Sequence, residues 1–310
     1  MDIQIVIQQM IVMLIIIFIG YFFTKKGKLN ELSSRHISGL VVNVCNPAML
    51  VCSAFSADSQ VSGALLLNAL LATLLLYAIL LLAGFLIPRL MRYPADEHYI
   101  YHFLTVYGNV GFLGIPLVSA VLGSNALIYV SINVLVFNIL FYLTGLNIIR
   151  KKAGVTTASG PKEILSKLVN TGTVSALFTI IFYLSDFDVP LIITNTLDYT
   201  GRATTFLSML VLGIAVAQMP LKEIFCHGKD YVFIIIRMIL LPILCVLLLR
   251  SFVSDPLIMG VCCLMISVPA ANLPLMCSKE YGLRTAELTR MIILTTLLSV
   301  LTIPLVVSFM

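Results

Sequence analysis

Two stretches of sequence, NVGFLGIPL at residues 109–117 and SVPAANLPL at residues 267–275, interrupt strongly apolar segments in the same way. Each carries a proline, Pro116 or Pro274, where a helix would otherwise continue. Proline lacks a backbone N–H donor and its ring clashes with the preceding turn, so the sequence predicts a broken or kinked helix at both places. The two prolines lie 158 residues apart (274 − 116), which indicates one structural element used twice.

The composition is that of a protein embedded in a bilayer. Hydrophobic residues make up 60% of the 310 residues and charged residues only 11%, unlike an average soluble domain. The net charge of +5 is modest and the basic residues lie mostly in loops, which argues against nucleic-acid binding. Apolar runs predict an all-α integral membrane protein with ten transmembrane helices, at about residues 4–23, 36–56, 62–88, 99–121, 125–149, 165–185, 193–217, 231–250, 256–277 and 286–309.

Loop charges predict how these helices are oriented. Alternate loops hold sixteen lysines and arginines, a count that includes Arg290, whereas the opposite loops hold none apart from Arg250 at an edge. By the positive-inside rule, both termini are expected outside a multi-pass protein of the plasma membrane. A polar stretch divides the chain into a first five-helix repeat (1–152), a cytoplasmic linker (153–161) and a second repeat (162–310). Five spans per half would invert the second repeat relative to the first.

The paired prolines also predict a binding site near mid-span. Interrupted helices at corresponding positions of two halves are the best pointer in sequence to a transporter's substrate site. Unwound backbone exposes amides there, and half-helix N-termini carry partial positive charge, which suits an anion. The alternative is that prolines and glycines kink these helices only for packing. The offset of 158 aligns Asn109 with Ser267, Gly111 with Pro269, and Gly114 with Asn272.

Further amides lie within the predicted spans. Asn43 and Asn46 share one helical face, and Asn46 is expected either to contact substrate or to join helices. Asn133 and Asn138 of the fifth predicted span are interpreted as packing residues.

Two arginines, Arg202 and Arg237, fall inside predicted spans and are candidates to attract an anion, with a structural cation as the alternative role of Arg237. Each is also close enough to a span end to extend its charge to the interface. Asp198 lies one helical turn before Arg202, which predicts a local ion pair.

The residues that are missing narrow the function classes. No acidic residue is predicted at mid-membrane, which argues against a carboxylate-based proton relay or sodium site, although Na⁺ could bind unwound carbonyls. The four histidines and seven cysteines lack metal-ligand spacing, so neither a metal nor a cofactor is expected, and the cysteines are interpreted as buried packing residues. No HExxH, GxSxG or P-loop motif occurs, so the chain is not expected to be an enzyme.

The motifs together resemble those of the auxin efflux carrier family, which includes bacterial malate or malonate permeases and is related to the plant PIN-formed auxin exporters. The resemblance extends over nearly the whole chain. The matching residues are Asn46-Pro47-Ala48, Asn109 to Pro116, Leu212-Gly213, Pro269 to Asn272, Lys279 to Gly282 and Thr295 to Pro304.

This resemblance implies a fold like that of the bile acid–sodium symporters, with two inverted five-helix repeats. Spans 1, 2, 6 and 7 would form a scaffold, and spans 3–5 and 8–10 a mobile transport domain in which the broken fourth and ninth helices cross. Substrate would bind beside the crossing, and the motif assigns that role to Asn109, Pro116, Pro269 and Asn272. Two departures, Phe206 where the family often has proline and Arg202 where it has a small or amide residue, prevent a transfer of substrate identity.

We therefore expect a secondary active or facilitative transporter of a small organic anion, a carboxylate such as malate, malonate or an auxin-like acid, working by elevator-type alternating access. Membrane lipid surrounds such a protein, coupling to H⁺ or Na⁺ stays open, and a homodimer is a family-level expectation. The alternatives are a sodium-coupled symporter of bile-acid-like substrates and, from another class, a substrate-sensing membrane receptor. The residues expected at the substrate are Asn46, Asn109, Gly111, Pro116, Ser267, Pro269, Asn272 and Pro274.

Overall fold

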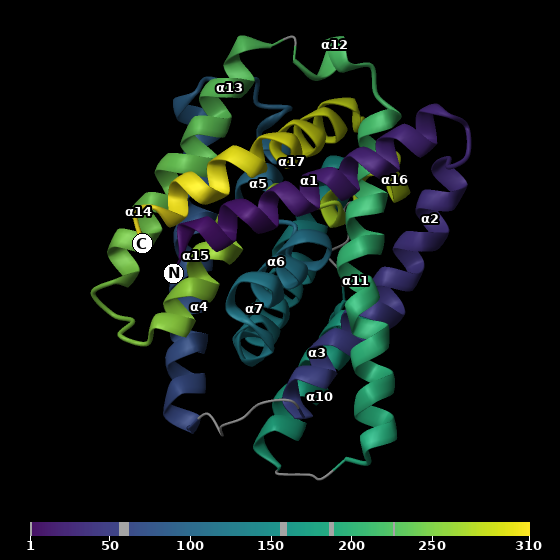
Figure 1. Cartoon of the computed structure of the whole chain (residues 1–310). Coiled ribbons are helices and arrows are strands. Elements are labelled where there is room, and N and C mark those ends of the chain that lie inside the picture. Colours follow the sequence, from purple (N-terminus) through teal and green to yellow (C-terminus); the bar gives the residue numbers. More distant parts are fainter. Residues whose placement is uncertain (1, 56–61, 156–159, 186–188, 226) are drawn as a thin grey trace.

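The computed structural model describes residues 2–55, 62–155, 160–185, 189–225 and 227–310. Over these residues the chain is helical, and the pairing of extended backbone is confined to an isolated antiparallel bridge between Gly108 and Ala270 (Figure 1). Cys226 and residues 156–159 of the expected linker at 153–161 lie outside the described residues. The other six cysteines are buried, in keeping with packing residues.

Seven helical segments of the described chain are long and apolar enough to cross a membrane. The pair α9 (Pro161–Leu168) and α10 (Thr171–Leu184), bent by 69°, makes an eighth if it is one span. The seven are α1 (Ile3–Lys25), α2–η1–α3 (Glu31–Phe55), α4 (Gly63–Leu90), η3–α7–η4–α8 (Ser124–Lys152), α11 (Leu191–Ala217), α13–η5–α14 (Gly228–Leu249) and α17 (Ala286–Val307).

The fourth and ninth expected spans are broken, as the sequence predicts. The fourth consists of α5 (His98–Val106) followed by η2 (Val110–Gly114) and α6 (Ile115–Leu122). The ninth consists of α15 (Pro256–Ser267) and α16 (Leu273–Glu280). A short helix, α12 (Leu221–Ile224), follows α11. Each of the ten expected segments is thus helical, but crossing by all ten as an inverted repeat stays a prediction.

Three of the prolines within the helices are accommodated by π-helical turns, whereas Pro88 of α4 and Pro304 of α17 lie in α-helix. A residue just before each of these three prolines donates its N–H to the carbonyl five residues back, as Ile115 does to Val110. This wider turn removes the clash that a proline ring makes in an α-helix. The pattern occurs three times: η1 (Val41–Cys45) before Pro47, η2 before Pro116, and η5 (Ile236–Leu240) before Pro242.

The fourth span is broken as expected, but Pro116 is not the residue that breaks it. The helix stops at Tyr107–Asn109, and Pro116 lies seven residues beyond Asn109, inside a continuous helix. In the ninth segment the break contains Pro269, and Pro274 occupies the first turn of α16, where a missing N–H costs nothing. The two prolines thus occupy different positions relative to the breaks.

The helices α1 and α11 pack along each other through two glycines. A Cβ atom at Gly20 would lie 2.5 Å from the backbone oxygen of Leu210, and one at Gly213 would overlap the backbone oxygen of Ile17. Only residues without a side chain allow two helices to approach this closely, as is common in membrane bundles. The helix α11 also packs against α2 and α3, and α3 against α10.

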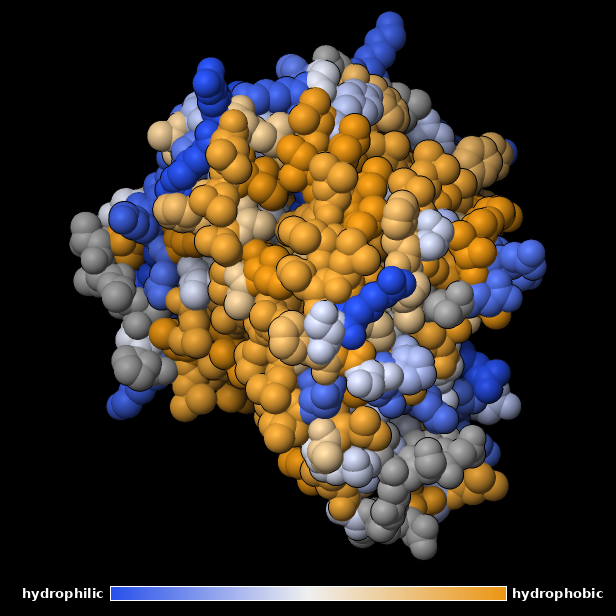
Figure 2. All heavy atoms as spheres, turned by 90° about the vertical axis from the view of Figure 1, so that its left-hand side faces the viewer, coloured by the Kyte–Doolittle hydropathy of each residue, from blue (hydrophilic) through white to orange (hydrophobic). Residues whose placement is uncertain are grey.

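The outer surface is apolar where it would meet lipid. Figure 2 shows one face covered largely by hydrophobic side chains, with hydrophilic residues concentrated toward its margins. Large apolar side chains are exposed on α1, α4 and α14, among them Phe18, Leu82 and Leu247. The helices α7, α15 and α17 are buried on most sides and form the centre of the core.

One cation that the sequence assigns to a loop, Arg290, lies within a helix. Arg290 is buried in α17, where its guanidinium pairs with Asp230 of α13 and with Glu287. The Tyr101 hydroxyl donates to the same Glu287 carboxylate at 3.3 Å. Two carboxylate partners allow this arginine to be buried without leaving its charge uncompensated. The sequence count therefore included one cation too many, and the alternation of the loops is unchanged.

Candidate functional site

The two broken helices cross through their backbones. The N–H of Asn109 donates to the carbonyl of Pro269 at 2.7 Å, and the N–H of Ala271 donates to the carbonyl of Tyr107 at 2.9 Å. These bonds satisfy amide and carbonyl groups that the helix breaks would otherwise leave unpaired in an apolar core. The bridged residues, Gly108 and Ala270, are 162 positions apart (270 − 108). The offset of 158 taken from the prolines therefore misaligns the two breaks by four residues.

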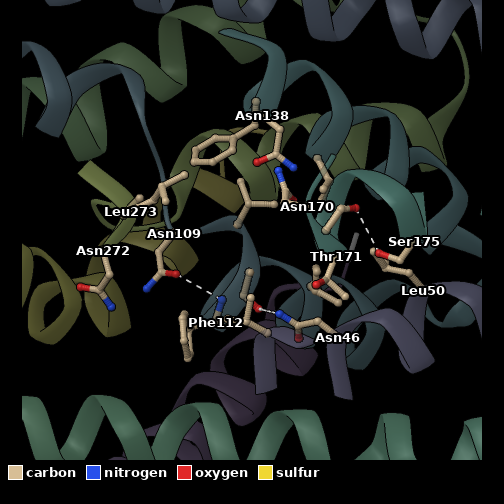
Figure 3. A pocket seen from close by; sticks show the side chains of 18 of the residues that line it. Asn46, Leu50, Asn109, Phe112, Asn138, Asn170, Thr171, Ser175, Asn272 and Leu273 are labelled. Carbon is tan, nitrogen blue, oxygen red and sulfur yellow. Dashed lines mark hydrogen bonds between the residues drawn. The ribbon is translucent and has the colours of Figure 1, made fainter. Parts of the chain in front are cut away.

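A cavity of about 270 Å³ lies beside this crossing. Its wall includes residues of η1 and α3, of the α5–η2 break, of α7, of the start of α10, and of the break before α16. No Asp, Glu, Lys, Arg or His is among the described residues that line it, and six of them are asparagines. The six are Asn43, Asn46, Asn109, Asn138, Asn170 and Asn272 (Figure 3).

Asn109 has one end of its amide fixed and the other end unpaired. Its Oδ1 accepts the N–H of Phe112 at 3.2 Å and so caps the half-helix that begins at Val110. Its Nδ2 is buried and has no hydrogen-bond partner among the described residues. A buried unpaired donor is costly unless a ligand or water satisfies it. The side chain is thus oriented by the protein and keeps one donor for a bound molecule.

Asn46 links α3 to the broken helix. Its Nδ2 donates to the carbonyl of Gly111 at 3.1 Å. Gly111 has no π-helical donor because residue 116, five positions on, is a proline. The Oδ1 of Asn46 is buried without a partner among the described residues. Pro116 and Asn46 therefore form one local arrangement in which the proline leaves the Gly111 carbonyl without a backbone donor and the amide donates to it.

Of the four remaining asparagine side chains in the wall, two have no hydrogen-bond partner among the described residues and two are bonded to other parts of the protein. The side chains of Asn138 and Asn272 make no hydrogen bond within the described part of the chain. Asn170 caps α10 by accepting the N–H of Thr173 at 3.1 Å, and Asn43 accepts the hydroxyl of Thr171 at 2.8 Å. In Figure 3 the amides of Asn109 and Asn272 lie together on one side of the pocket. The free amide groups thus face the cavity from both broken helices and from α7.

Two half-helices begin at the cavity wall. The turn η2 starts at Val110 and α16 starts at Leu273, and both residues line the pocket. The unpaired N–H groups of a helix N-terminus carry partial positive charge of about half an elementary charge. With no charged side chain in the wall, these ends and the amide groups determine the local field. The pocket is therefore suited to an anion.

The predicted site residues divide into two groups. Asn46, Asn109, Gly111 and Asn272 line the pocket. The other four lie in the supporting structure: Pro116 and Pro274 in the half-helices, Pro269 in the crossing, and Ser267 at the end of α15, where its hydroxyl donates to the Cys263 carbonyl at 2.6 Å.

The two candidate arginines also lie away from this pocket. Arg202 is exposed and forms the predicted ion pair with Asp198, at 2.8 Å, in the wall of a second cavity between α3, α11 and the α6–α7 turn. Arg237 is 2% exposed, so the expectation that it reaches the membrane interface is wrong. Its guanidinium donates instead to two backbone carbonyls, Leu104 O at 3.2 Å and Ile266 O at 3.0 Å.

The sequence analysis missed part of the wall. Asn138 was interpreted as a packing residue, yet it reaches the cavity from α7. Asn170, Thr171 and Ser175, at the start of α10, were not considered. A signal existed in the asparagine placed just before an apolar run, which is typical of a helix N-cap. What the sequence did not show is that this cap lies next to the crossing.

The fold and pocket define a class: a multi-pass α-helical membrane protein with a pocket at the crossing of two broken helices whose described wall is apolar apart from its asparagines and a few other neutral polar groups. The chain belongs to the membrane transport protein family, which it matches over residues 5–307, and the predicted resemblance to auxin efflux carriers is confirmed at the family level. A protein of Rhizobium meliloti (strain 1021) named "Putative malonate transporter" is 23% identical over 301 residues, covering 93% of this chain and 90% of that protein.

Proposed function

We propose that this protein is a transporter of a small organic anion, a mono- or dicarboxylate, that binds in the asparagine-lined pocket at the crossing. The observation that carries the proposal is the pocket wall itself. It presents free amide groups of Asn109, Asn138 and Asn272 and two half-helix N-termini, and none of the described residues that line it carries a charged side chain. The family membership and the name of the Rhizobium relative support a transporter.

The chemistry of the wall favours a carboxylate. Each carboxylate oxygen accepts hydrogen bonds, and the wall supplies donors from side-chain amides and from backbone N–H groups at helix starts. An amide is neutral, so burying it in an empty pocket does not strand a charge in the core. The same donors bind the anion when it arrives. This arrangement can hold and release an anion at moderate cost.

The size of the cavity favours a small substrate. Its volume of about 270 Å³ lies below the range of roughly 300–1,000 Å³ that is typical of pockets for drug-sized ligands. A carboxylate of malonate or malate size fits this volume better than a steroid-sized bile acid does. The substrate class we propose is therefore a short mono- or dicarboxylic acid.

Alternating access would follow from the two cavities. The asparagine-lined pocket includes the start of α10, whereas the second cavity, of about 610 Å³, includes the start of α11 and the C-terminal part of α3. We propose that the group containing α4–α8 and α13–α17 moves against α1–α3 and α9–α11, so that the crossing is reached from either side. Rigid-body displacement of one group of helices against the other is the usual form of alternating access in repeat-built transporters.

Uptake into proteoliposomes tests this proposal. Radiolabelled malonate, malate, indole-3-acetate and taurocholate would be compared with choline or Na⁺ as the external cation, with and without a pH gradient. We expect saturable uptake of at least one short carboxylate, competed by unlabelled analogues, and none of taurocholate. Uptake of taurocholate alone, dependent on Na⁺, would show that the bile-acid-like alternative is correct. Binding without uptake of any carboxylate would favour a receptor.

A further inference from the structure

Arg237 occupies a position that the proposed function does not explain. Its side chain is among the largest fully buried ones in the protein, and it lies in η5, outside the wall of the pocket. Within the described residues it forms no ion pair with a carboxylate. A buried cation without a charged partner is expensive unless other groups compensate it. The compensating groups are backbone carbonyls.

These carbonyls are placed symmetrically about the crossing. Leu104 lies four residues before Gly108, and Ile266 lies four residues before Ala270, which are the two bridged residues. Each carbonyl belongs to the last turn of a half-helix, α5 or α15. A helix C-terminus carries about half a negative elementary charge on its unpaired carbonyls. One guanidinium therefore meets the negative ends of both half-helices at once.

We propose that Arg237 is the fixed cation of the crossing: it neutralises the carbonyl ends of α5 and α15 and so allows the pocket to bind an anion without a bound Na⁺. Two helix ends of about −0.5 each are offset by one guanidinium of +1. The field in the pocket is then set by the N-terminal ends of η2 and α16. Arg237 is thus a positioning residue that acts through the two half-helices, and the inference rests on the proposed anion site.

Binding measured on the purified full-length protein tests the role of the charge. Calorimetry with malonate and the other short carboxylates would be run in NaCl and in choline chloride at equal ionic strength. We expect wild-type affinity to be the same in both salts. Arg237→Met, which keeps the volume but removes the charge, should weaken binding by at least about tenfold, and Arg237→Lys should retain most of it. Arg89→Met, at an exposed arginine, is the matched control and should change nothing.

Chemical rescue distinguishes the contribution of the Arg237 charge from the contribution of its packing. Arg237→Ala leaves space for a small molecule, so millimolar guanidinium should restore binding, whereas urea, which has a similar shape and no charge, should not. A purely structural role would give equal effects of both molecules. Equal rescue, or wild-type affinity in Arg237→Met, would overturn the proposal. So would a wild-type protein that binds carboxylate only in Na⁺.

A second measurement does not depend on the substrate. Hydrogen–deuterium exchange at the N–H groups of Asn109 and Ala271, which form the crossing, should rise in Arg237→Met and stay near wild type in Arg237→Lys. Unchanged exchange in Arg237→Met would show that the arginine does not hold the half-helices. If the wild type binds no carboxylate in either salt, the proposed function is wrong, and the exchange result still decides the role of Arg237.

Discussion

At the scale of single residues, the pocket that we propose for an anion would obtain its selectivity for charge from neutral side chains. A lysine or arginine in the wall would attract an anion more strongly, but it would also be stranded when the pocket is empty. Asparagine avoids this cost because one amide can serve two tasks. Asn109 fixes a half-helix through Oδ1 and keeps Nδ2 for a ligand. The only buried cation near the crossing among the described residues, Arg237, is bonded to carbonyls outside the wall.

Replacement of Asn109 by alanine is the residue-scale prediction. The change removes the unpaired donor and the cap on Phe112, so we expect carboxylate uptake to fall at least about tenfold, with a stability cost of about 1 kcal/mol for the lost cap. Asn272→Ala should lower uptake similarly at a smaller stability cost, since its side chain makes no cap bond. Proteoliposome uptake and thermal unfolding in detergent measure the two effects.

The matched control for this prediction is Asn133→Ala. Asn133 is equally buried in α7, accepts the Tyr77 hydroxyl at 3.4 Å and does not line the pocket. We expect it to lose stability and keep its uptake rate per folded molecule. Wild-type uptake in both Asn109→Ala and Asn272→Ala would remove these residues from the substrate site.

At the scale of elements, the prolines show how far the sequence could be interpreted. That the fourth and ninth segments are broken, and that Asn109 and Asn272 lie at the breaks, followed from Pro116, Pro274 and their apolar surroundings. The position of the first break did not follow, because a π turn accommodates Pro116 and the helix α5 ends ten residues earlier, at Val106. Local sequence indicates that a helix must adapt to proline, but tertiary contacts decide between a wider turn and a break.

The contribution of α10 to the site was missed for a related reason. Its cap, Asn170, is an ordinary helix start in sequence, and only the packing of α10 against α3 and α7 brings it to the cavity. Arg237 is the converse case. Its position within an apolar segment is unusual for an arginine and is visible in the sequence. Its partners are the backbone carbonyls of Leu104 and Ile266 in other helices. Because every residue has a backbone carbonyl, the sequence does not indicate which ones the arginine contacts.

The close packing of α1 on α11 gives the element-scale prediction. Gly213→Ala places a methyl group onto the backbone of α1 at Ile17, so we expect a loss of about 1–3 kcal/mol in stability from overpacking. Gly39→Ala is the control, since a Cβ atom there meets nothing within 4 Å and alanine gains about 0.5–1 kcal/mol over glycine in a helix. Thermal unfolding in the same detergent should therefore shift in opposite directions. Equal shifts would mean that the two helices do not touch as described.

At the scale of the whole molecule, the two cavities lie along the same helix, since Asn46 and Leu50 of α3 line the asparagine-lined pocket and Cys52 lines the second cavity. The helices α1, α2, α3, α10 and α11 contact one another, whereas α4, α5, α7, α15 and α17 surround the crossing. The substrate pocket is formed between these groups, because Asn46 and Asn170 come from the first and Asn109, Asn138 and Asn272 from the second. A movement of one group against the other would therefore carry half of the wall away and change access to the bound anion.

Spin-label distances test that movement. Labels at Lys28 and Ala95, which are exposed in the loops after α1 and α4, report on the two groups in a background without native cysteines. We expect saturating carboxylate to shift their distance distribution by about 5 Å or more, the length of one helical turn, because an elevator slides one group past the other. Labels at Lys28 and Lys222, exposed near the ends of α1 and α11, should keep their distance because the glycine contact joins those helices. Equal changes in both pairs would indicate a general loosening, and no change in either pair, in a protein that transports, would require a gate within a fixed frame.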